Sequence, residues 1–169
     1  MLGETNSIEG VLMEFLTPIL PKIGGDPTRE ALINLHQLIS GNAASMVSNL
    51  VGGHHRHLAL TMTAEEYMEQ TGYTFVPPHN PGNYPPMMGT AQEQVLRTKR
   101  FRENQVIFRI YTAVGGSLKN QIVMVVKPVF LSPLVEQFIG FRHVSALVML
   151  QSFSPPTGQY IKLTSSNKQ

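Results

Sequence analysis

The prolines of this chain limit its fold more than any other feature of the sequence. Five of them fall within residues 76–89, a stretch without a charged side chain: Pro77, Pro78, Pro81, Pro85 and Pro86. Proline fixes φ and has no N–H to donate, so this stretch cannot stay helical for long. We predict a proline-rich loop that connects two helical halves. A PxxP ligand is the weaker alternative, because prolines in connections usually act as rigid spacers.

Helical periodicity on both sides of this loop predicts an all-α fold of about five or six short helices. Twelve prolines and fourteen glycines in 169 residues imply long irregular connections between those helices. Residues 1–25 are expected to form a flexible, extended N-terminal arm, in which a short amphipathic turn ends at Pro18 and Pro21. Residues 26–153 form the predicted helical domain. Residues 154–169, rich in Ser, Pro, Thr and Lys, form a predicted disordered tail.

Capping signals mark where helices of this domain begin. Asp26 can cap free backbone amides and Pro27 suits the first helical position, so a helix is predicted to start there. It should fade by about Asn49, before a Gly-Gly stop signal. Thr63 and Glu66 have the spacing of a capping box, which predicts a second, short helix.

The longest predicted helix runs from Thr90 to about Val114. Its start could be marked by Thr90, which has Glu93 three residues later, or by Thr98. Gly115-Gly116-Ser117 is interpreted as a C-cap followed by a new N-cap, which starts a short buried helix over residues 118–126. The β-branched residues of that stretch would also suit a buried strand, but the capping signals around it favour the helix. Two more short helices are predicted over residues 130–139 and 146–152.

The predicted helices share one apolar core, because their apolar side chains recur at helical spacing. His36 lies on the same face as its apolar neighbours and is interpreted as a hydrogen-bonded core histidine rather than a ligand. The predicted core residues are Leu32, Leu35, Ile39, Phe101, Phe108, Tyr111, Leu147 and Leu150.

Charge is distributed unevenly along the chain. Residues 1–75 hold eight acidic and three basic residues, whereas residues 76–127 hold two acidic and seven basic ones. Four of these cations fall in the first half of the longest predicted helix, where they oppose the helix macrodipole. We predict that they contact RNA or the acidic half of another copy; the alternative is an ordinary solvated helix face. The four are Arg97, Lys99, Arg100 and Arg102.

Signs of catalytic chemistry are scarce. The chain has no cysteine, which excludes disulfides, Cys-containing zinc sites, iron–sulfur clusters and cysteine nucleophiles. His54, His55 and His57 are candidate ligands of zinc or copper, but adjacent histidines point to different faces, so no metal site is predicted. No nucleophile elbow, Walker loop or dinucleotide fingerprint occurs. We therefore expect no enzymatic activity, no cofactor and no small-molecule substrate.

The sequence also predicts no membrane partner. Its apolar runs fall far short of the roughly 20 residues that a membrane-spanning helix needs. Residues 8–23 are apolar, but they contain two prolines and lack the basic flank of a signal peptide. The absence of cysteine fits a reducing compartment, so we expect a cytoplasmic location.

Short segments spread over most of the chain resemble one known family. They include Leu16-Thr17-Pro18-Ile19-Leu20-Pro21, Gly41-Asn42-Ala43-Ala44-Ser45, His57-Leu58-Ala59-Leu60-Thr61-Met62 and Val144-Ser145-Ala146-Leu147-Val148-Met149-Leu150. In this order they are similar to the Gag-like, capsid-region polyprotein segment of copia-type LTR retrotransposons. The resemblance implies a helical structural protein that self-associates into capsid-like particles around RNA. The missing cysteines leave no zinc knuckle, so the resemblance implies the assembly part alone. The family often has an acidic residue near Lys127 and a helical continuation where this chain reads Pro155-Pro156, and these two departures suggest a truncated or decayed copy.

Two alternatives stand beside this assembly hypothesis. One is a small helical nucleic-acid-binding or regulatory module that works without forming particles. Salt-dependent RNA or DNA affinity in the absence of assembly would favour it. The other is an enzyme with a metal ion at residues 54–57, which metal analysis of the purified protein would decide.

Overall fold

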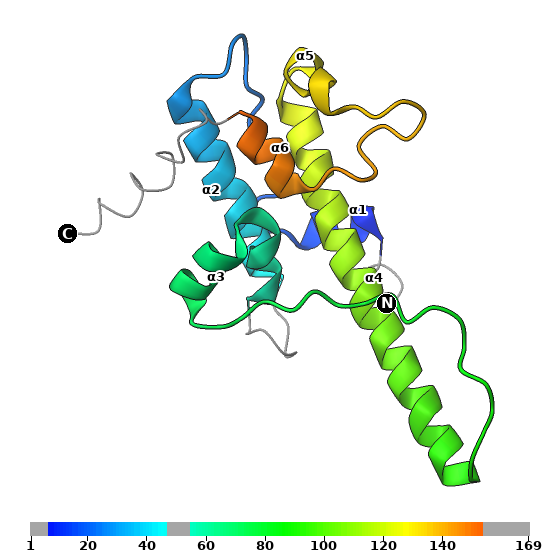
Figure 1. The fold of residues 1–169 in the computed structure, drawn as a ribbon. Coiled ribbons are helices and arrows are strands. Elements are labelled where there is room, and N and C mark those ends of the chain that lie inside the picture. Colours follow the sequence, from blue (N-terminus) through cyan, green and yellow to red (C-terminus); the bar gives the residue numbers. More distant parts are fainter. Residues whose placement is uncertain (1–6, 47–54, 154–169) are drawn as a thin grey trace.

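The computed structural model describes residues 7–46 and 55–153, which form an all-α fold (Figure 1). Helix accounts for 62% of the structure, and the described residues contain no strand, so the predicted fold class is confirmed. The α-helices of this part of the chain are α1 (Ile8–Glu14), α2 (Arg29–Ser45), α3 (Ala64–Thr71), α4 (Ala91–Val125), α5 (Pro128–Leu131) and α6 (Ala146–Ser152). Two short 3₁₀ helices join them, η1 (Arg56–Thr61) and η2 (Ser132–Leu134).

Helix α4 is the longest helix of the described residues and runs without interruption for 35 residues, a length of about 50 Å. The break predicted at Gly115-Gly116-Ser117 is wrong. A Cβ added to Gly116 would lie 3.1 Å from Cδ1 of Ile8, so the missing side chain is what lets α1 approach α4. Ser117 Oγ donates to the carbonyl of Ile8 at 3.0 Å. The glycine pair therefore marks the contact between α1 and α4. The two helices predicted on either side of the pair form the single helix α4.

The core lies where the second half of α4 meets α2 and α6, with Ile39, Leu118, Ile122 and Met149 fully buried. The buried part of α4 begins only at Ala113, so aromatic side chains that precede it stay near the surface. Four predicted core residues are buried as expected: Leu32, Leu35, Ile39 and Leu150. The other four are only half-buried: Phe101, Phe108, Tyr111 and Leu147.

The N-terminal segment packs against the core, which corrects the expectation of a flexible arm. Val11 and Phe15 are buried. The N–H of Thr17 donates to Asn42 Oδ1 at 2.8 Å, and its carbonyl accepts from the side-chain amide of Asn42 at 2.9 Å. Gln121 on α4 donates to the same carbonyl at 3.0 Å. Because buried amide side chains need hydrogen-bond partners, this segment is an integral part of the folded body.

Helix starts follow the capping signals closely. The capping box of Thr63 and Glu66 is present at α3, with both reciprocal hydrogen bonds. Helix α2 starts slightly later than predicted, because Thr28 rather than Asp26 is its N-cap and accepts from the N–H of Ala31 at 3.1 Å. The predicted fading of this helix near Asn49 and the predicted tail over residues 154–169 lie outside the described residues.

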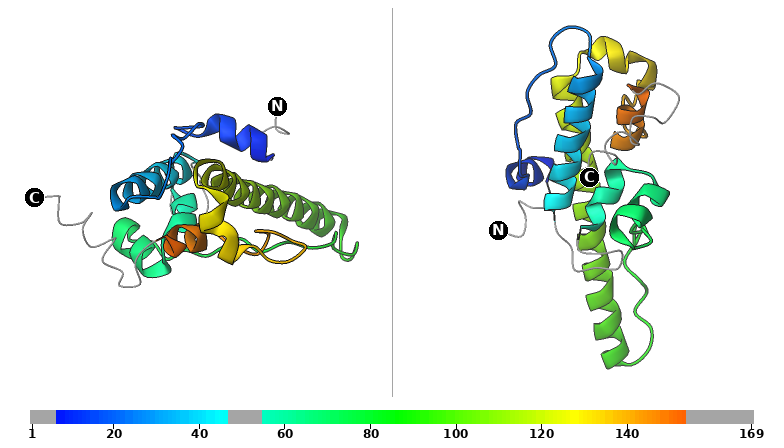
Figure 2. Two further views of the ribbon diagram at one scale, coloured as in Figure 1. Left: turned by 90° about the horizontal axis from the view of Figure 1, so that it is seen from above. Right: turned by 90° about the vertical axis from the view of Figure 1, so that its left-hand side faces the viewer.

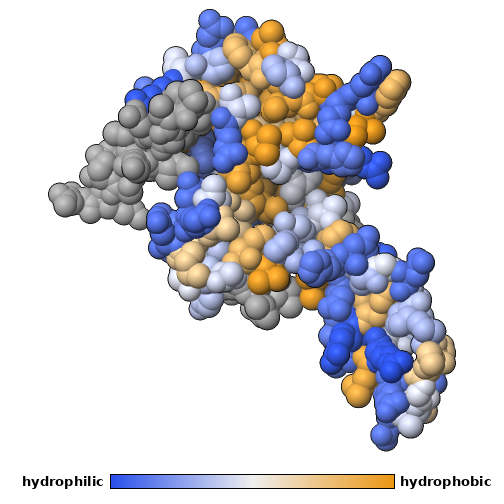
Figure 3. Space-filling model, viewed as in Figure 1, coloured by the Kyte–Doolittle hydropathy of each residue, from blue (hydrophilic) through white to orange (hydrophobic). Residues whose placement is uncertain are grey.

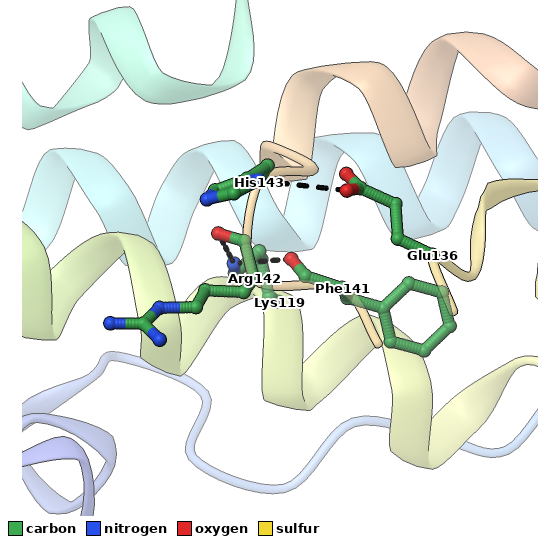
Figure 4. A network of polar contacts seen from close by, with 5 residues as sticks. All are labelled: Lys119, Glu136, Phe141, Arg142 and His143. Atoms are coloured by element: carbon green, nitrogen blue, oxygen red, sulfur yellow. Dashed lines mark hydrogen bonds and ion pairs between the residues drawn. The ribbon is translucent and has the colours of Figure 1, made fainter. Parts of the chain in front are cut away.

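The loop between η2 and α6 is held in place by a half-buried lysine (Figure 4). Lys119 Nζ on α4 donates to the carbonyls of Phe141 and Arg142 at 2.9 and 3.4 Å. Burial lowers the pKa of Lys119, yet the two carbonyls give its ammonium the acceptors it needs. Glu136 and His143 approach to 3.5 Å across the same loop.

A tight turn within this loop replaces most of the helix predicted over residues 130–139. Pro133 restricts the helical part to α5 and η2. Glu136 and Gly140 then exchange two backbone hydrogen bonds of 2.9 Å each, which closes the turn. Phe138 at its tip has a φ of 73° and a side chain that is 95% exposed. A bulky residue in this left-handed region is strained.

Candidate binding site on a projecting arm

The first part of α4 and the proline-rich connection extend together beyond the body, as both views of Figure 2 show. We call residues 76–110 the arm. Its tip is fixed by a capping box at the start of α4: the N–H of Thr90 donates to Glu93 Oε2 at 3.0 Å, and the N–H of Glu93 donates to Thr90 Oγ1 at 3.3 Å. Gly89 precedes the cap with a φ of 94°, a conformation that glycine adopts without strain. The chain thus reverses direction at the tip and continues as helix.

The proline-rich connection packs along one side of α4. The ring of Tyr84 meets the ring of Phe101 edge to face, with centroids 5.1 Å apart, and its hydroxyl bonds to Thr98. Gln94 Nε2 donates to the carbonyl of Gly89 at 3.1 Å. These contacts explain why Phe101, predicted as a core residue, is only half-buried: its partner is the connection itself.

The base of the arm is anchored to the body through aromatic rings. Phe75 lies between Tyr67 of α3 and Tyr111 of α4, with ring centroids 5.8 and 6.2 Å away. Tyr67 is fully buried. Helix α3, the connection and α4 are therefore held in a fixed relation where the arm leaves the body.

The four predicted cations do not form a single patch. Successive residues of a helix are about 100° apart, so Lys99 and Arg102, three residues apart, share one side of α4. Arg100 points about 100° away from Lys99. Arg97 is turned toward the connection, where its Nη1 donates to the carbonyl of Met88 at 3.2 Å. The structure thus brings together two of the four and assigns Arg97 a structural hydrogen bond.

Sequence reasoning missed part of this site. Arg109 is exposed and lies seven residues after Arg102, two helical turns further along the same side of α4. Val95 and Val106 flank the pair of cations on this side and are 67% and 42% exposed. We call these five residues the basic stripe: Val95, Lys99, Arg102, Val106 and Arg109. Helical periodicity alone would have grouped them.

The surface of the arm mixes charged and apolar side chains (Figure 3). Leu96, Met87 and Met88 are 65%, 67% and 63% exposed around its outer end. The arm carries five basic and two acidic residues, a balance of +3. No salt bridge within the described residues involves any of its cations. Although α4 is long, neither it nor any other described helix is apolar enough to cross a bilayer.

Two histidines of the sequence cluster, His55 and His57, cap the C-terminal end of α2. His55 Nδ1 donates to the carbonyl of Ala44 at 2.8 Å, and His57 Nδ1 donates to the carbonyl of Met46 at 2.7 Å. Both carbonyls belong to the C-terminal end of α2, where backbone acceptors lack helical partners. His54 lies outside the described residues. Within the described residues, no group of three or more His, Cys, Asp or Glu side chains could hold a metal ion.

The body has two further features, a hydrogen-bonded histidine and a cavity. His36 Nε2 donates to the carbonyl of Thr61 at 2.9 Å, and burial lowers the pKa of this imidazole despite the opposing effects of that bond and of Glu66. The prediction of a hydrogen-bonded histidine at this position is confirmed. A cavity of about 290 Å³ lies between residues 21–28 and α2, lined among others by Ile23 and Leu38.

Comparison of the chain with models of protein families, with curated proteins and with solved structures finds no match.

Proposed function

We propose that this protein acts by binding and self-association, and that copies contact one another through the arm. One observation carries the proposal: Val95 and Leu96, 67% and 65% exposed, stand on a positively charged helix segment that extends away from the body. These side chains add little to the stability of the fold. Their burial against a partner would remove apolar surface from water, which favours association.

Together with the family resemblance, the arm supports a more specific proposal. We infer a Gag-like structural protein of a retrotransposon, located in the cytoplasm, whose copies assemble into capsid-like particles around RNA. A projecting element reaches a neighbouring copy without rearrangement of the body. Lys99, Arg100 and Arg102 are exposed and have no ion-pair partner among the described residues, so they are the proposed contacts for phosphate groups or acidic side chains.

Sedimentation velocity and negative-stain microscopy of the purified chain, each with and without RNA, test this proposal. The expected result is oligomers whose size increases with protein concentration. A protein that remains monomeric at every concentration, with and without RNA, would contradict it. Salt-dependent RNA binding by a monomer would instead favour the nucleic-acid-binding module.

A double variant identifies the surface responsible. Val95→Ser with Leu96→Ser removes apolar area from the arm, and association should weaken by roughly tenfold or more, because burial of a Val or Leu side chain contributes about 1.5–3 kcal/mol. The matched control is Leu16→Ser with Val129→Ser, which alters side chains that are 76% and 66% exposed on the body. An equal loss of association in both double variants would show that the arm has no special role.

A further inference from the structure

The arm carries a charge balance of +3, which favours an acidic surface of the chain as its acceptor. Helix α3 is the most acidic element: it holds Glu65, Glu66 and Glu69, and no Lys or Arg occurs in the sequence between Arg56 and Arg97. The cations of its positive counterpart, the basic stripe, all follow that interval. The two surfaces are therefore strongly opposite in charge.

Helix α3 presents two of its three carboxylates to solvent on one side. Glu65 and Glu69 are four residues apart and both exposed, and Met68 between them is 43% exposed. Tyr67 is buried on the opposite side and fixes the helix to the body. The side-chain carboxylates of Glu65 and Glu69 make no hydrogen bond or ion pair with any described residue. We call Glu65, Met68 and Glu69 the acidic face.

The other acidic residues are placed less suitably. Glu66 is engaged in the capping box, where its Oε2 accepts from the N–H of Thr63 at 2.9 Å. Glu9 and Glu14 of α1 are five residues apart, so their side chains diverge by about 140° around the helix. Glu30 is adjacent to Arg29, which reduces its local charge. Within the described helices, the acidic face is the one place where two unengaged carboxylates lie one helical turn apart.

We propose that the basic stripe of one copy docks on the acidic face of a second copy. This docking rests on the proposed function, self-association through the arm, and specifies the two surfaces that meet. Lys99 and Arg102 are one helical turn apart, as are Glu65 and Glu69, so two ion pairs form at once. Met68 lies against the exposed valines of the stripe. Because the stripe and the face are different surfaces, the contact either closes reciprocally into a two-fold dimer or continues head to tail.

Charge reversal tests the pairing. Lys99→Glu with Arg102→Glu, and separately Glu65→Lys with Glu69→Lys, should each weaken self-association by roughly tenfold or more, because like charges then oppose each other. The quadruple variant, with both surfaces reversed, should regain association. Glu9→Lys with Glu14→Lys is the matched acidic control, and Lys127→Glu with Arg142→Glu is the matched basic control. Circular dichroism checks that each variant folds, and Glu65→Gln with Glu69→Gln is the milder substitute.

The outcomes separate this proposal from the one it rests on. If the native chain associates but reversal of the acidic face has no effect, or if the α1 control weakens association equally, the acceptor is wrong and self-association stands. If charge reversal of the basic stripe abolishes RNA binding and leaves self-association intact, the stripe binds RNA, and the proposed pairing of the stripe with the acidic face is overturned. If the native chain never associates, the proposed function itself fails.

The absence of cysteine from the chain allows a direct test of contact. Val106→Cys in one preparation and Met68→Cys in another leave every charge unchanged, and oxidation of the mixture should give a disulfide-linked heterodimer. Such a bond requires the two Cα atoms to come within about 7 Å. Val129→Cys on α5 replaces Val106→Cys as the control and should give no heterodimer. Equal cross-linking of the control would overturn the proposed contact.

Discussion

The side-chain amide of Asn42 on α2 donates to the side-chain carbonyl of Gln121 on α4 at 2.9 Å, in the interior of the protein. Both residues also bond to Thr17, so two helices and the N-terminal segment meet at one polar point in an apolar core. Each buried polar group there has a partner, and removal of one partner leaves others unsatisfied.

Replacement of Asn42 by alanine should therefore lower the free energy of unfolding by about 2–4 kcal/mol, because the N–H of Thr17 and the carbonyl of Gln121 lose their partner. Urea denaturation measures the change. Asn104→Ala, on the exposed surface of α4, is the control and should change stability by less than about 0.5 kcal/mol. A similarly small effect at Asn42 would show that the network does not hold the N-terminal segment in solution.

Gly115 sits within continuous helix, and the nearest atom to an added Cβ is Cδ2 of Leu60 at 4.0 Å. Gly115→Ala should raise the free energy of unfolding by about 0.5–1 kcal/mol, since alanine loses less backbone entropy in a helix. The gain at Gly116 should be smaller, because Ile8 has to move by a few tenths of an ångström. Thermal denaturation compares the two. Clear destabilisation by Gly115→Ala would indicate that the helix is interrupted there after all.

The pKa of His36 is lowered by burial, so the folded protein takes up a proton less readily than the unfolded chain, whose histidine titrates near 6.5. Stability contributed by neutral His36 is present above that pH and declines as the pH falls below it. Urea midpoints between pH 5 and 8 should show this decline, and His36→Gln, which can still donate to Thr61, should reduce it. His143→Gln, at an exposed position, is the control; an unchanged pH profile in His36→Gln would contradict the assignment.

Phe138 occupies a left-handed backbone conformation with its side chain in solvent. Phe138→Asn should raise the free energy of unfolding by about 0.5–1 kcal/mol, because asparagine tolerates positive φ and no packing is lost. Val129→Asn, at an exposed position of ordinary helical geometry, should show no such gain. Destabilisation by Phe138→Asn would mean that this ring makes a contact in solution, for example within an oligomer.

Local signals in the sequence predicted the parts of the fold that local chemistry determines. The capping boxes at Thr63 and Thr90 involve residues three apart, so the sequence alone locates them. The role of Gly116 depends on Ile8, more than a hundred residues earlier, and no local pattern reveals that approach. For the same reason Thr17 was expected to lie in a flexible N-terminal segment. Its backbone is in fact held by the side-chain amides of Asn42 and Gln121, which are distant in the sequence.

The candidate site was predictable in position but not in form. The sequence placed the cations around Arg100 on one long helix, as the structure does, yet the hydrogen bond of Arg97 to Met88 depends on how the proline-rich connection folds back. Grouping by helical period would have added Arg109 to Lys99 and Arg102. The exposure of Val95 could not be foreseen, because a projecting helix and a buried one have the same periodicity.

Because α4 continues through Gly115-Gly116 without a break, the arm is rigidly connected to the core. Its direction is fixed by the packing of Leu118 and Ile122 and by the aromatic contacts of Phe75 at its base, not by the residues that would touch a neighbour. In any assembly built through the arm, the angle between successive copies, and hence the curvature of the resulting shell or filament, is set inside the body. Substitutions deep in the core would then change the shape of the assembly while every contact surface stays the same.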